Sequence, residues 1–264
     1  PLASIYREDG FRTGAFISAV ALDSTFGLDR GFEVYMDDMG PPDSKGHEPV
    51  QRRGAEVTDE AIAWLNRIGE DENFFAFVHY YDAHAKYEAP ADFATTGDAY
   101  DDELAYVDSQ VRRLQSWLES SRRDKDTIVV LIADHGESLG EHGEPTHGAL
   151  IYQGTQHIPW ILCMPDGRWA GTEVTERVGQ VDFMPTMLSL YDLAQPSTAS
   201  GRSLLPLLEQ PDRPWKTAVF SQYPRSFQGN RHRKRGDLMG YAVRTERHRY
   251  QQHPGSNTNE GRAV

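Results

Sequence analysis

Histidines and acids gather on two short segments of the 264-residue chain. Asp134, His135 and His147 follow one apolar run, and His84 and Lys86 follow another. Carboxylates and imidazoles bind divalent cations, and an imidazole also exchanges protons near neutral pH. Together with a lysine, such groups could hold a tetrahedral anion and protonate a leaving group. Whether they act together depends on the elements that position them.

Each of these residues also has a simpler interpretation. The D-H-G of Asp134–Gly136 could be only a turn, in which the aspartate caps a helix and the glycine supplies a positive φ. Taken singly, the remaining residues are typical of solvated loops or an acidic face: His84, His142, His147, Glu137, Glu141 and Glu144. The functional interpretation therefore depends on their occurrence together, in one order and spacing.

Four apolar, β-rich runs predict buried strands, because each is short and bounded by charged residues, glycine or proline. They are residues 14–20, 74–81, 127–134 and 158–165.

Amphipathic patterns predict three helices, at residues 58–70, 100–123 and 181–194. Thr58 is the expected N-cap of the first helix. The second helix carries an apolar stripe that predicts its buried face: Leu104, Val107, Val111, Leu114 and Leu118.

Buried strands that alternate with helices are typical of an α/β fold with a mostly parallel central sheet and helices on both faces. In such sheets ligands bind beyond the carboxyl ends of the strands, so we expect Asp134, His135 and His84 at one rim. An ionised carboxylate at a buried strand end is costly unless a cation compensates it. This argument favours a divalent metal ion at Asp134.

The pattern changes after the Pro-rich segment 206–214. Residues 217–224 and 239–252 predict antiparallel strands of a smaller layer. We therefore assign residues 1–205 to an α/β core and residues 206–264 to the start of a C-terminal α+β subdomain.

Composition limits the classes of partner. The formal net charge of −13 argues against binding to nucleic acid or to an anionic membrane, because those surfaces repel a polyanion. No apolar run is long enough to predict a membrane-spanning helix. The single cysteine, Cys163, excludes an internal disulfide and a Cys-rich metal site. Its position in a predicted strand indicates a small core residue.

Several segments resemble the sulfatase family, within the alkaline-phosphatase-like superfamily. Residues 133–165, ADHGESLGEHGEPTHGALIYQGTQHIPWILCMP, resemble the family region in which a strand ends in D-H-G or D-N-G before L-G-E-H-G. Residues 74–90 resemble its F-F segment that leads to P-H-x-P-Y, and VDFMPT and GRSLLPLL resemble its V-D-x-x-P-T and G-x-S-L-x-P-L-L stretches. SQYPR and MGYAVRTERHRY are similar to the iduronate-2-sulfatase-like branch.

Two departures from the family pattern concern catalysis and the loop around His84. No segment fits C-x-P-x-R or S-x-P-x-R, whose Cys or Ser becomes the formylglycine nucleophile of family members. Ala83 and Lys86 replace the prolines of P-H-x-P. The resemblance therefore implies the C-terminal portion of a sulfatase, with formylglycine expected only in the missing N-terminal portion. A complementary N-terminal chain is then an expected partner, and the isolated chain is expected to be poorly soluble.

The resemblance implies roles for four residues. Asp134 takes the position of a metal-binding aspartate and His135 that of the next ligand. The family's metal is Ca²⁺, although an imidazole also suits zinc or manganese. His84 takes the position of the histidine that contacts the sulfate and protonates the leaving oxygen. His147 stands where many relatives place a sulfate-binding lysine, so the charge there would depend on pH.

The implied function is metal-dependent hydrolysis of a sulfate ester on a small molecule or oligosaccharide, with a glycosaminoglycan-type sugar favoured. Lys86 and Arg225 are candidates for binding a substrate carboxylate. The basic run 231–235, RHRKR, could contact a polyanionic sugar or be a solvated loop. Two alternatives stay open: a phosphodiesterase or phosphonate monoester hydrolase of the same superfamily, and a non-catalytic binding protein.

Overall fold

The computed structural model describes residues 1–41, 50–147, 151–215, 219–224 and 239–244. It divides into two compact units, Pro1–Lys125 and Asp126–Val264. Across the described ranges, no helix combines the length and apolar character needed to cross a bilayer. The boundary expected between residues 205 and 206 stays a prediction.

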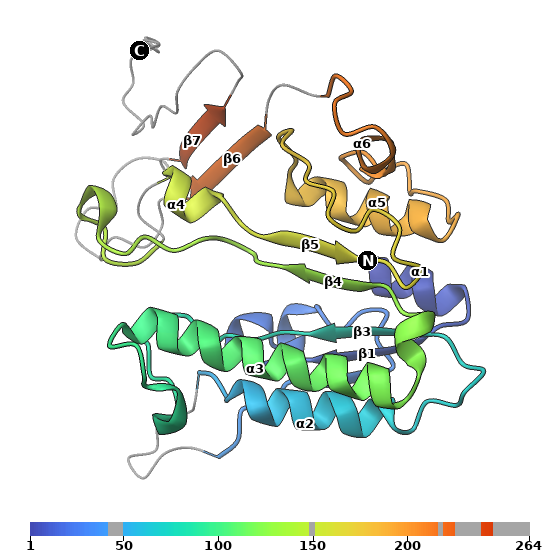
Figure 1. The fold of residues 1–264 in the computed structure, drawn as a ribbon, viewed down its shortest axis with the longest axis horizontal. Coiled ribbons are helices and arrows are strands. Elements are labelled where there is room, and N and C mark those ends of the chain that lie inside the picture. Colours follow the sequence, from blue (N-terminus) through green and yellow to red (C-terminus); the bar gives the residue numbers. More distant parts are fainter. Residues whose placement is uncertain (42–49, 148–150, 216–218, 225–238, 245–264) are drawn as a thin grey trace. The chain divides into compact units, whose positions relative to one another are not determined.

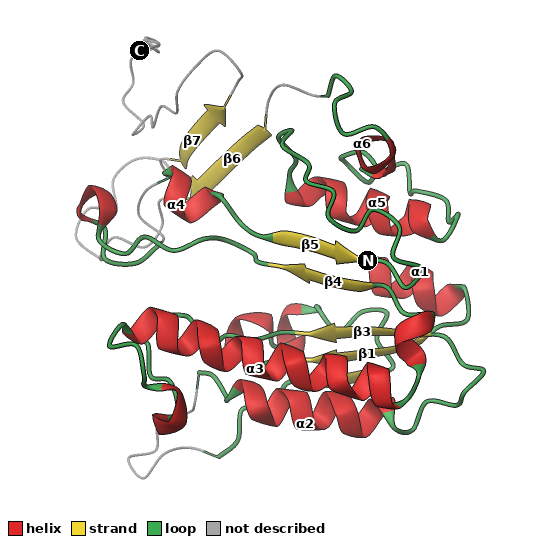
Figure 2. Ribbon diagram, in the orientation of Figure 1, coloured by secondary structure: helices red, strands yellow, loops and turns green. Residues whose placement is uncertain are grey.

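The first unit holds a parallel three-stranded sheet with strand order β2-β1-β3, and Figure 1 shows β1 beside β3. Its elements are α1 (Leu2–Glu8), β1 (Arg12–Phe16), β2 (Val34–Met36), α2 (Gly54–Leu65), β3 (Phe74–Val78) and α3 (Ala99–Ser120). The strands predicted at residues 14–20 and 74–81 are β1 and β3. The parallel pairing, with α2 and α3 as the neighbouring helices, gives the α/β fold class that the sequence predicts (Figure 2).

Strand β3 alternates its side chains between two apolar layers. Phe74, Ala76 and Val78 pack against a core of buried residues from β1 and α2. Phe75 faces the other layer, where its ring centroid lies 5.1 Å from that of Tyr6 in α1. Helix α2 therefore covers one face of the sheet, whereas the other face is covered only in part, because Phe77 of β3 is 40 % exposed.

Helix α2 begins four residues before the predicted start, so Thr58 is not its N-cap. Thr58 is fully buried, and its hydroxyl donates to the Gly54 carbonyl at 2.8 Å. The cap comes from the loop after β3, where Asp82 Oδ2 accepts the Gly54 N–H at 2.9 Å. A Cβ added at Gly54 would lie 3.0 Å from that same oxygen, so glycine allows the carboxylate to approach. A cap supplied from another element leaves no local sequence signal.

The predicted apolar stripe of α3 is correct only in part. Leu114 packs against the core, but Leu104 is exposed. The most deeply buried residues of the helix are largely polar: Asp102, Glu103, Tyr106 and Gln110. Periodicity in apolar residues missed this face, because carboxylates occupy it and bind backbone donors of the adjoining loops.

The second unit contains two antiparallel strand pairs, β4 with β5 and β6 with β7. Its elements are β4 (Val129–Ile132), α4 (Gln153–Gln156), β5 (Trp160–Cys163), α5 (Phe183–Leu190), α6 (Leu205–Glu209), β6 (Val219–Pro224) and β7 (Met239–Arg244). The antiparallel strands predicted at 217–224 and 239–252 are confirmed as far as the described residues extend.

The β4–β5 ribbon exposes one side, contrary to the prediction of fully buried strands. Leu131 and Ile161 are register partners, and both are exposed. Cys163 lies two residues beyond Ile161, on the same side of the strand, and is exposed as well. The prediction that Cys163 is a core residue is therefore wrong.

The entry to α5 is fixed by a buried aspartate. Asp182 is fully buried, and its two carboxylate oxygens accept the N–H groups of Gly179 and Arg202, each at 2.9 Å. The Thr186 hydroxyl donates to the Asp182 carbonyl at 2.6 Å and accepts the Leu204 N–H at 3.0 Å. These contacts join the V-D-x-x-P-T segment to the G-x-S-L segment, so the polar residues of both segments have a structural role.

Candidate functional site

In the first unit, His84 lies in the loop that follows β3. Its Nδ1 is 2.7 Å from the Ala85 carbonyl oxygen, and its Nε2 is 3.0 Å from the Tyr81 hydroxyl. The two rings stack with centroids 4.2 Å apart. Because a carbonyl only accepts, Nδ1 carries the proton in neutral His84, and Nε2 accepts from Tyr81. A second proton taken up by His84 would reside on Nε2, the nitrogen suited to protonate a leaving group.

The aspartate before His84 is a structural anchor. Asp82 has a buried side chain that caps α2 and lies 3.6 Å from the Arg53 guanidinium. Burial raises the pKa of Asp82, although hydrogen bonds and Arg53 oppose that effect. Asp82 therefore holds the loop to the helix.

Of the predicted substrate-binding residues, one lies within the described residues. Lys86 is exposed in the His84 loop. Arg225 and the basic run 231–235 lie outside the described residues.

In the second unit, Asp134 follows β4 as predicted, but its surroundings differ from the expectation. The carboxylate is 81 % exposed, so it does not need a cation to offset burial. Its Oδ1 accepts the His135 N–H at 2.9 Å. The Gln180 side-chain amide donates to the Asp134 carbonyl at 2.5 Å and fixes the strand end. The metal assignment at Asp134 consequently rests on the family resemblance alone.

The side chains of Asp134 and His135 lie next to each other. His135 Nδ1 lies 2.9 Å from the Gly136 carbonyl, so Nε2 holds the lone pair in the neutral ring. That Nε2 is 3.6 Å from Asp134 Oδ2, a separation at which both atoms could contact one ion. Among the described residues, no group of three or more His, Cys, Asp or Glu is arranged to hold a metal. Metal binding by Asp134 and His135 therefore stays a prediction.

The glycine of D-H-G serves close packing rather than a turn of positive φ. The Gly136 N–H donates to the Thr155 carbonyl at 3.0 Å, and a Cβ at Gly136 would lie 2.1 Å from the Gly154 oxygen. No helix begins at residues 135–137 for Asp134 to cap. The D-H-G motif is therefore not a simple turn in which the aspartate caps a helix.

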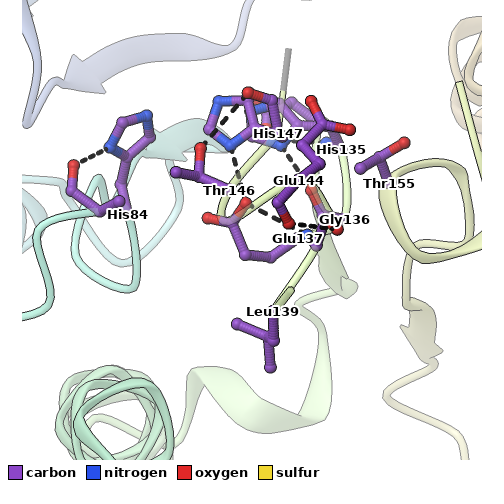
Figure 3. Close-up of polar contacts among 12 residues, drawn as sticks. His84, His135, Gly136, Glu137, Leu139, Glu144, Thr146, His147 and Thr155 are labelled. Atoms are coloured by element: carbon purple, nitrogen blue, oxygen red, sulfur yellow. Dashed lines mark hydrogen bonds and ion pairs between the residues drawn. The ribbon is translucent and has the colours of Figure 1, made fainter. Parts of the chain in front are cut away.

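His147 has a carboxylate partner that the sequence did not reveal. Glu137 Oε1 lies 3.0 Å from His147 Nδ1, and only 6 % of the glutamate side chain is exposed. Figure 3 shows this bond, with the His135 and His147 rings side by side at a centroid separation of 4.0 Å. The Ser138 hydroxyl donates to the Glu144 carbonyl at 2.9 Å and folds the loop back. A contact between residues ten apart across such a loop has no periodic signal.

Comparison with known proteins shows which family the chain resembles over most of its length. The family model described as "Sulfatase" matches residues 1–193, and the one described as "N-sulphoglucosamine sulphohydrolase, C-terminal" matches residues 140–256. An uncharacterized sulfatase, YidJ, of Escherichia coli is 24% identical over 217 residues, 62% of this chain and 43% of that protein. An N-acetylglucosamine-6-O-sulfatase of Bacteroides thetaiotaomicron is 32% identical over 146 residues, 53% of this chain and 25% of that protein. The chain thus spans less than half the length of these relatives.

Solved structures show the same fold. A complex with the substrate D-glucosamine-2-N,6-O-disulfate superposes with a TM-score of 0.75 at 17% identity, covering 98% of this chain and 74% of that one. A phosphonate monoester hydrolase of Silicibacter pomeroyi gives a TM-score of 0.67 at 20% identity, covering 92% and 69%. These likenesses concern the fold, whereas the "Sulfatase" match covers most of the sequence. The chain belongs to the sulfatase family.

Proposed function

We propose that the protein is a sulfuric ester hydrolase that cleaves a sulfate ester on a carbohydrate. The observation that carries the proposal is the sulfatase-family match over residues 1–193, which contains His84, Asp134, His135 and His147. From the resemblance to the family, we assign these residues to the binding of metal and sulfate. The iduronate-2-sulfatase-like branch remains a narrower form of the same proposal.

In the proposed reaction, His84 protonates the departing sugar oxygen. A sugar alkoxide is a poor leaving group, so a positioned acid has a large effect on its departure. Nδ1–H of His84 donates to the Ala85 carbonyl, so Nε2 is the nitrogen that takes up the catalytic proton and passes it on. Tyr81 stacks on the ring and limits its rotation. Its hydroxyl occupies Nε2 until a substrate oxygen replaces it.

In the same reaction, His147 in its doubly protonated form donates from Nε2–H to a non-bridging sulfate oxygen, while its Nδ1–H donates to Glu137. Asp134 and His135 contribute ligands to a divalent metal, with Ca²⁺ favoured by the family. When bound, such an ion stabilises negative charge on the sulfate oxygens. The formylglycine motif does not occur in residues 1–264, so the proposal includes a further segment or a complementary N-terminal chain that supplies the nucleophile.

The proposed substrate class is a sulfated amino sugar of the glycosaminoglycan type. Support comes from the relative named as an N-acetylglucosamine-6-O-sulfatase and from the structural neighbour solved with a disulfated glucosamine. Lys86 and Arg225 are the candidates for contacts with a sugar carboxylate or a second sulfate.

A second candidate function is hydrolysis of a phosphonate monoester or phosphodiester. The structural likeness to phosphonate monoester hydrolases of Silicibacter pomeroyi and Agrobacterium radiobacter favours it, with TM-scores of 0.67 and 0.62. Tetrahedral phosphonate and sulfate present similar oxygens to a metal and a histidine, so this chain would serve either reaction. A non-catalytic binding protein would hydrolyse neither.

The test is turnover by the complete gene product that contains this chain, matured with a formylglycine-generating enzyme. N-acetylglucosamine 6-sulfate, glucosamine-2-N,6-O-disulfate and a phosphonate monoester are the substrates. We expect hydrolysis of a sulfate ester, and loss of that activity on treatment with EDTA. His84→Ala should lower kcat/KM on the sugar sulfate about 10²- to 10⁴-fold, the usual contribution of a general acid. Its thermal unfolding midpoint should stay near that of the wild type.

Preference for the phosphonate would replace the proposal by the second candidate. Normal turnover of the sugar sulfate by His84→Ala would remove His84 from the mechanism.

A further inference from the structure

A buried carboxylate on α3 closes the loop that carries His84. Glu103 is 2 % exposed, and its Oε2 accepts the Ala83 N–H at 2.8 Å while its Oε1 accepts the Glu88 N–H at 2.9 Å. The two donors flank His84 on either side in sequence. A single side chain therefore fixes both ends of the segment that contains the proposed acid.

The charge of Glu103 is compensated within the same unit. Arg53 Nη1 lies 3.7 Å from Glu103 Oε1 and 3.6 Å from Asp82 Oδ1. These separations exceed a hydrogen bond, and Nη1 is buried without a hydrogen-bond partner, so its contribution is electrostatic. A cation between two buried carboxylates offsets their desolvation. Glu103 can thus remain an acceptor for both N–H groups.

We call the pair of hydrogen bonds from the Ala83 and Glu88 amides to Glu103 the clamp. Ala83 stands at a position where the family pattern has proline. Proline fixes φ near −65° and lacks an N–H, whereas Ala83 has a φ of 72° and donates its N–H to Glu103. The loop before His84 is therefore ordered by hydrogen bonds to α3 rather than by a proline ring. Hydrogen bonds to a charged acceptor are about twice as strong as neutral ones, which suits this role.

We propose that Glu103 is a positioning residue for catalysis, which holds the His84 loop so that His84 Nε2 reaches the leaving oxygen. This inference rests on the proposed sulfatase function. Glu103 does not touch the substrate in this proposal, and its effect passes through the Ala83 and Glu88 amides. The consequence should be selective: reactions that need an acid should suffer, and reactions that do not should be nearly unaffected.

The experiment compares two substrates in the complete, matured protein. N-acetylglucosamine 6-sulfate has a poor leaving group, and 4-nitrophenyl sulfate has a good one that needs little protonation. In Glu103→Gln one carboxylate oxygen becomes an amide NH₂, which cannot accept an N–H. We expect kcat/KM on the sugar sulfate to fall about tenfold more than on the nitrophenyl ester, a part of the 10²- to 10⁴-fold effect of a general acid. Glu103→Leu should widen that gap.

Asp102→Asn is the matched control, because Asp102 is the adjacent residue of α3 and is also buried. Its carboxylate accepts the N–H groups of Thr95 and Thr96 at 3.1 and 2.9 Å, in a loop that does not contain His84. This variant should leave the ratio of the two kcat/KM values unchanged. The ratio is measured within one sample, so partial unfolding does not alter it.

An equal loss on both substrates in Glu103→Gln would overturn the inference. If the wild-type protein hydrolyses no sulfate ester, the proposed function fails, and the positioning role is then decided by NMR of ¹⁵N-histidine-labelled protein. The His84 ring should show a single Nδ1–H tautomer in the wild type and in Asp102→Asn. Glu103→Gln should give a mixture, and an unchanged His84 spectrum would also count against the clamp.

Discussion

At the scale of single residues, three histidines share one arrangement. Nδ1 of His84 and of His135 faces the carbonyl of the following residue, and Nδ1 of His147 faces Glu137. Oxygen acceptors at Nδ1 leave Nε2 as the nitrogen for ligands or proton transfer. The sequence predicted which histidines to consider, because they follow strand ends. It could not predict their acceptors, because Glu137 reaches His147 only through the fold of the loop.

A change at Glu137 tests this arrangement at His147. Glu137→Gln keeps the shape of the side chain but lets its amide donate as well as accept, so His147 can adopt either neutral tautomer. We expect two-bond ¹⁵N–¹H correlation spectra to show one His147 tautomer in the wild type and two in the variant. Turnover of a sugar sulfate should fall about tenfold, as a misoriented histidine loses part of its catalytic contribution.

Glu141→Gln is the control, because Glu141 lies in the same loop and accepts the Leu139 N–H rather than contacting His147. A single unchanged tautomer in Glu137→Gln would show that Glu137 does not set the His147 ring.

At the scale of elements, strands were easier to predict than helix boundaries. Apolar runs located β1, β3, β4 and β5, although β4 and β5 are exposed on one side. The start of α2 was missed because Asp82, 28 residues beyond Gly54, supplies the cap. The buried face of α3 was missed because its carboxylates serve loops rather than the apolar core. Polar side chains that accept backbone N–H groups of another element need not recur every 3.6 residues, so helical periodicity does not reveal them.

The loop contact of Asp102 predicts a pH dependence of stability. Hydrogen bonds from Thr96 and then Thr95 lower the pKa of Asp102 from its ordinary value of 3.8. A carboxylate whose folded pKa is lowered stabilises the protein above its unfolded pKa, and this stabilisation is lost as the pH falls through the folded pKa. Asp102→Asn should therefore lower the free energy of unfolding at pH 7. The difference from wild type should shrink below about pH 3.8.

Urea unfolding of both proteins at pH 7 and pH 3 measures this difference. Asp59→Asn on the exposed side of α2 serves as the comparison, because the Asp59 carboxylate contacts the Arg113 side chain rather than loop amides. A difference that grew on acidification would contradict the assigned role of Asp102.

At the scale of the whole molecule, composition and alternation predicted the α/β class and the small antiparallel layer. They did not predict the division after Lys125, because the chain there has no Pro-rich or Gly-rich linker. Local sequence also missed the exposed side of the β4–β5 ribbon, where an apolar run is compatible with either burial or exposure. The sequence does state the net charge of this chain directly, and that charge bears on the proposed substrates.

The net charge of −13 on this chain contributes a repulsion to the encounter with a polyanionic sugar, and that repulsion should depend on ionic strength. Like charges repel over a Debye length, which shortens from about 30 Å at 0.01 M to about 10 Å at 0.1 M salt. We therefore expect kcat/KM to rise over this range, and to rise more for a disulfated than for a monosulfated glucosamine. The comparison of the two sugars in one protein separates charge repulsion from any general effect of salt on stability. A fall in kcat/KM would show that local cations outweigh the total charge. If the basic run 231–235 supplies those cations, replacing its basic residues should abolish the fall in kcat/KM with rising salt.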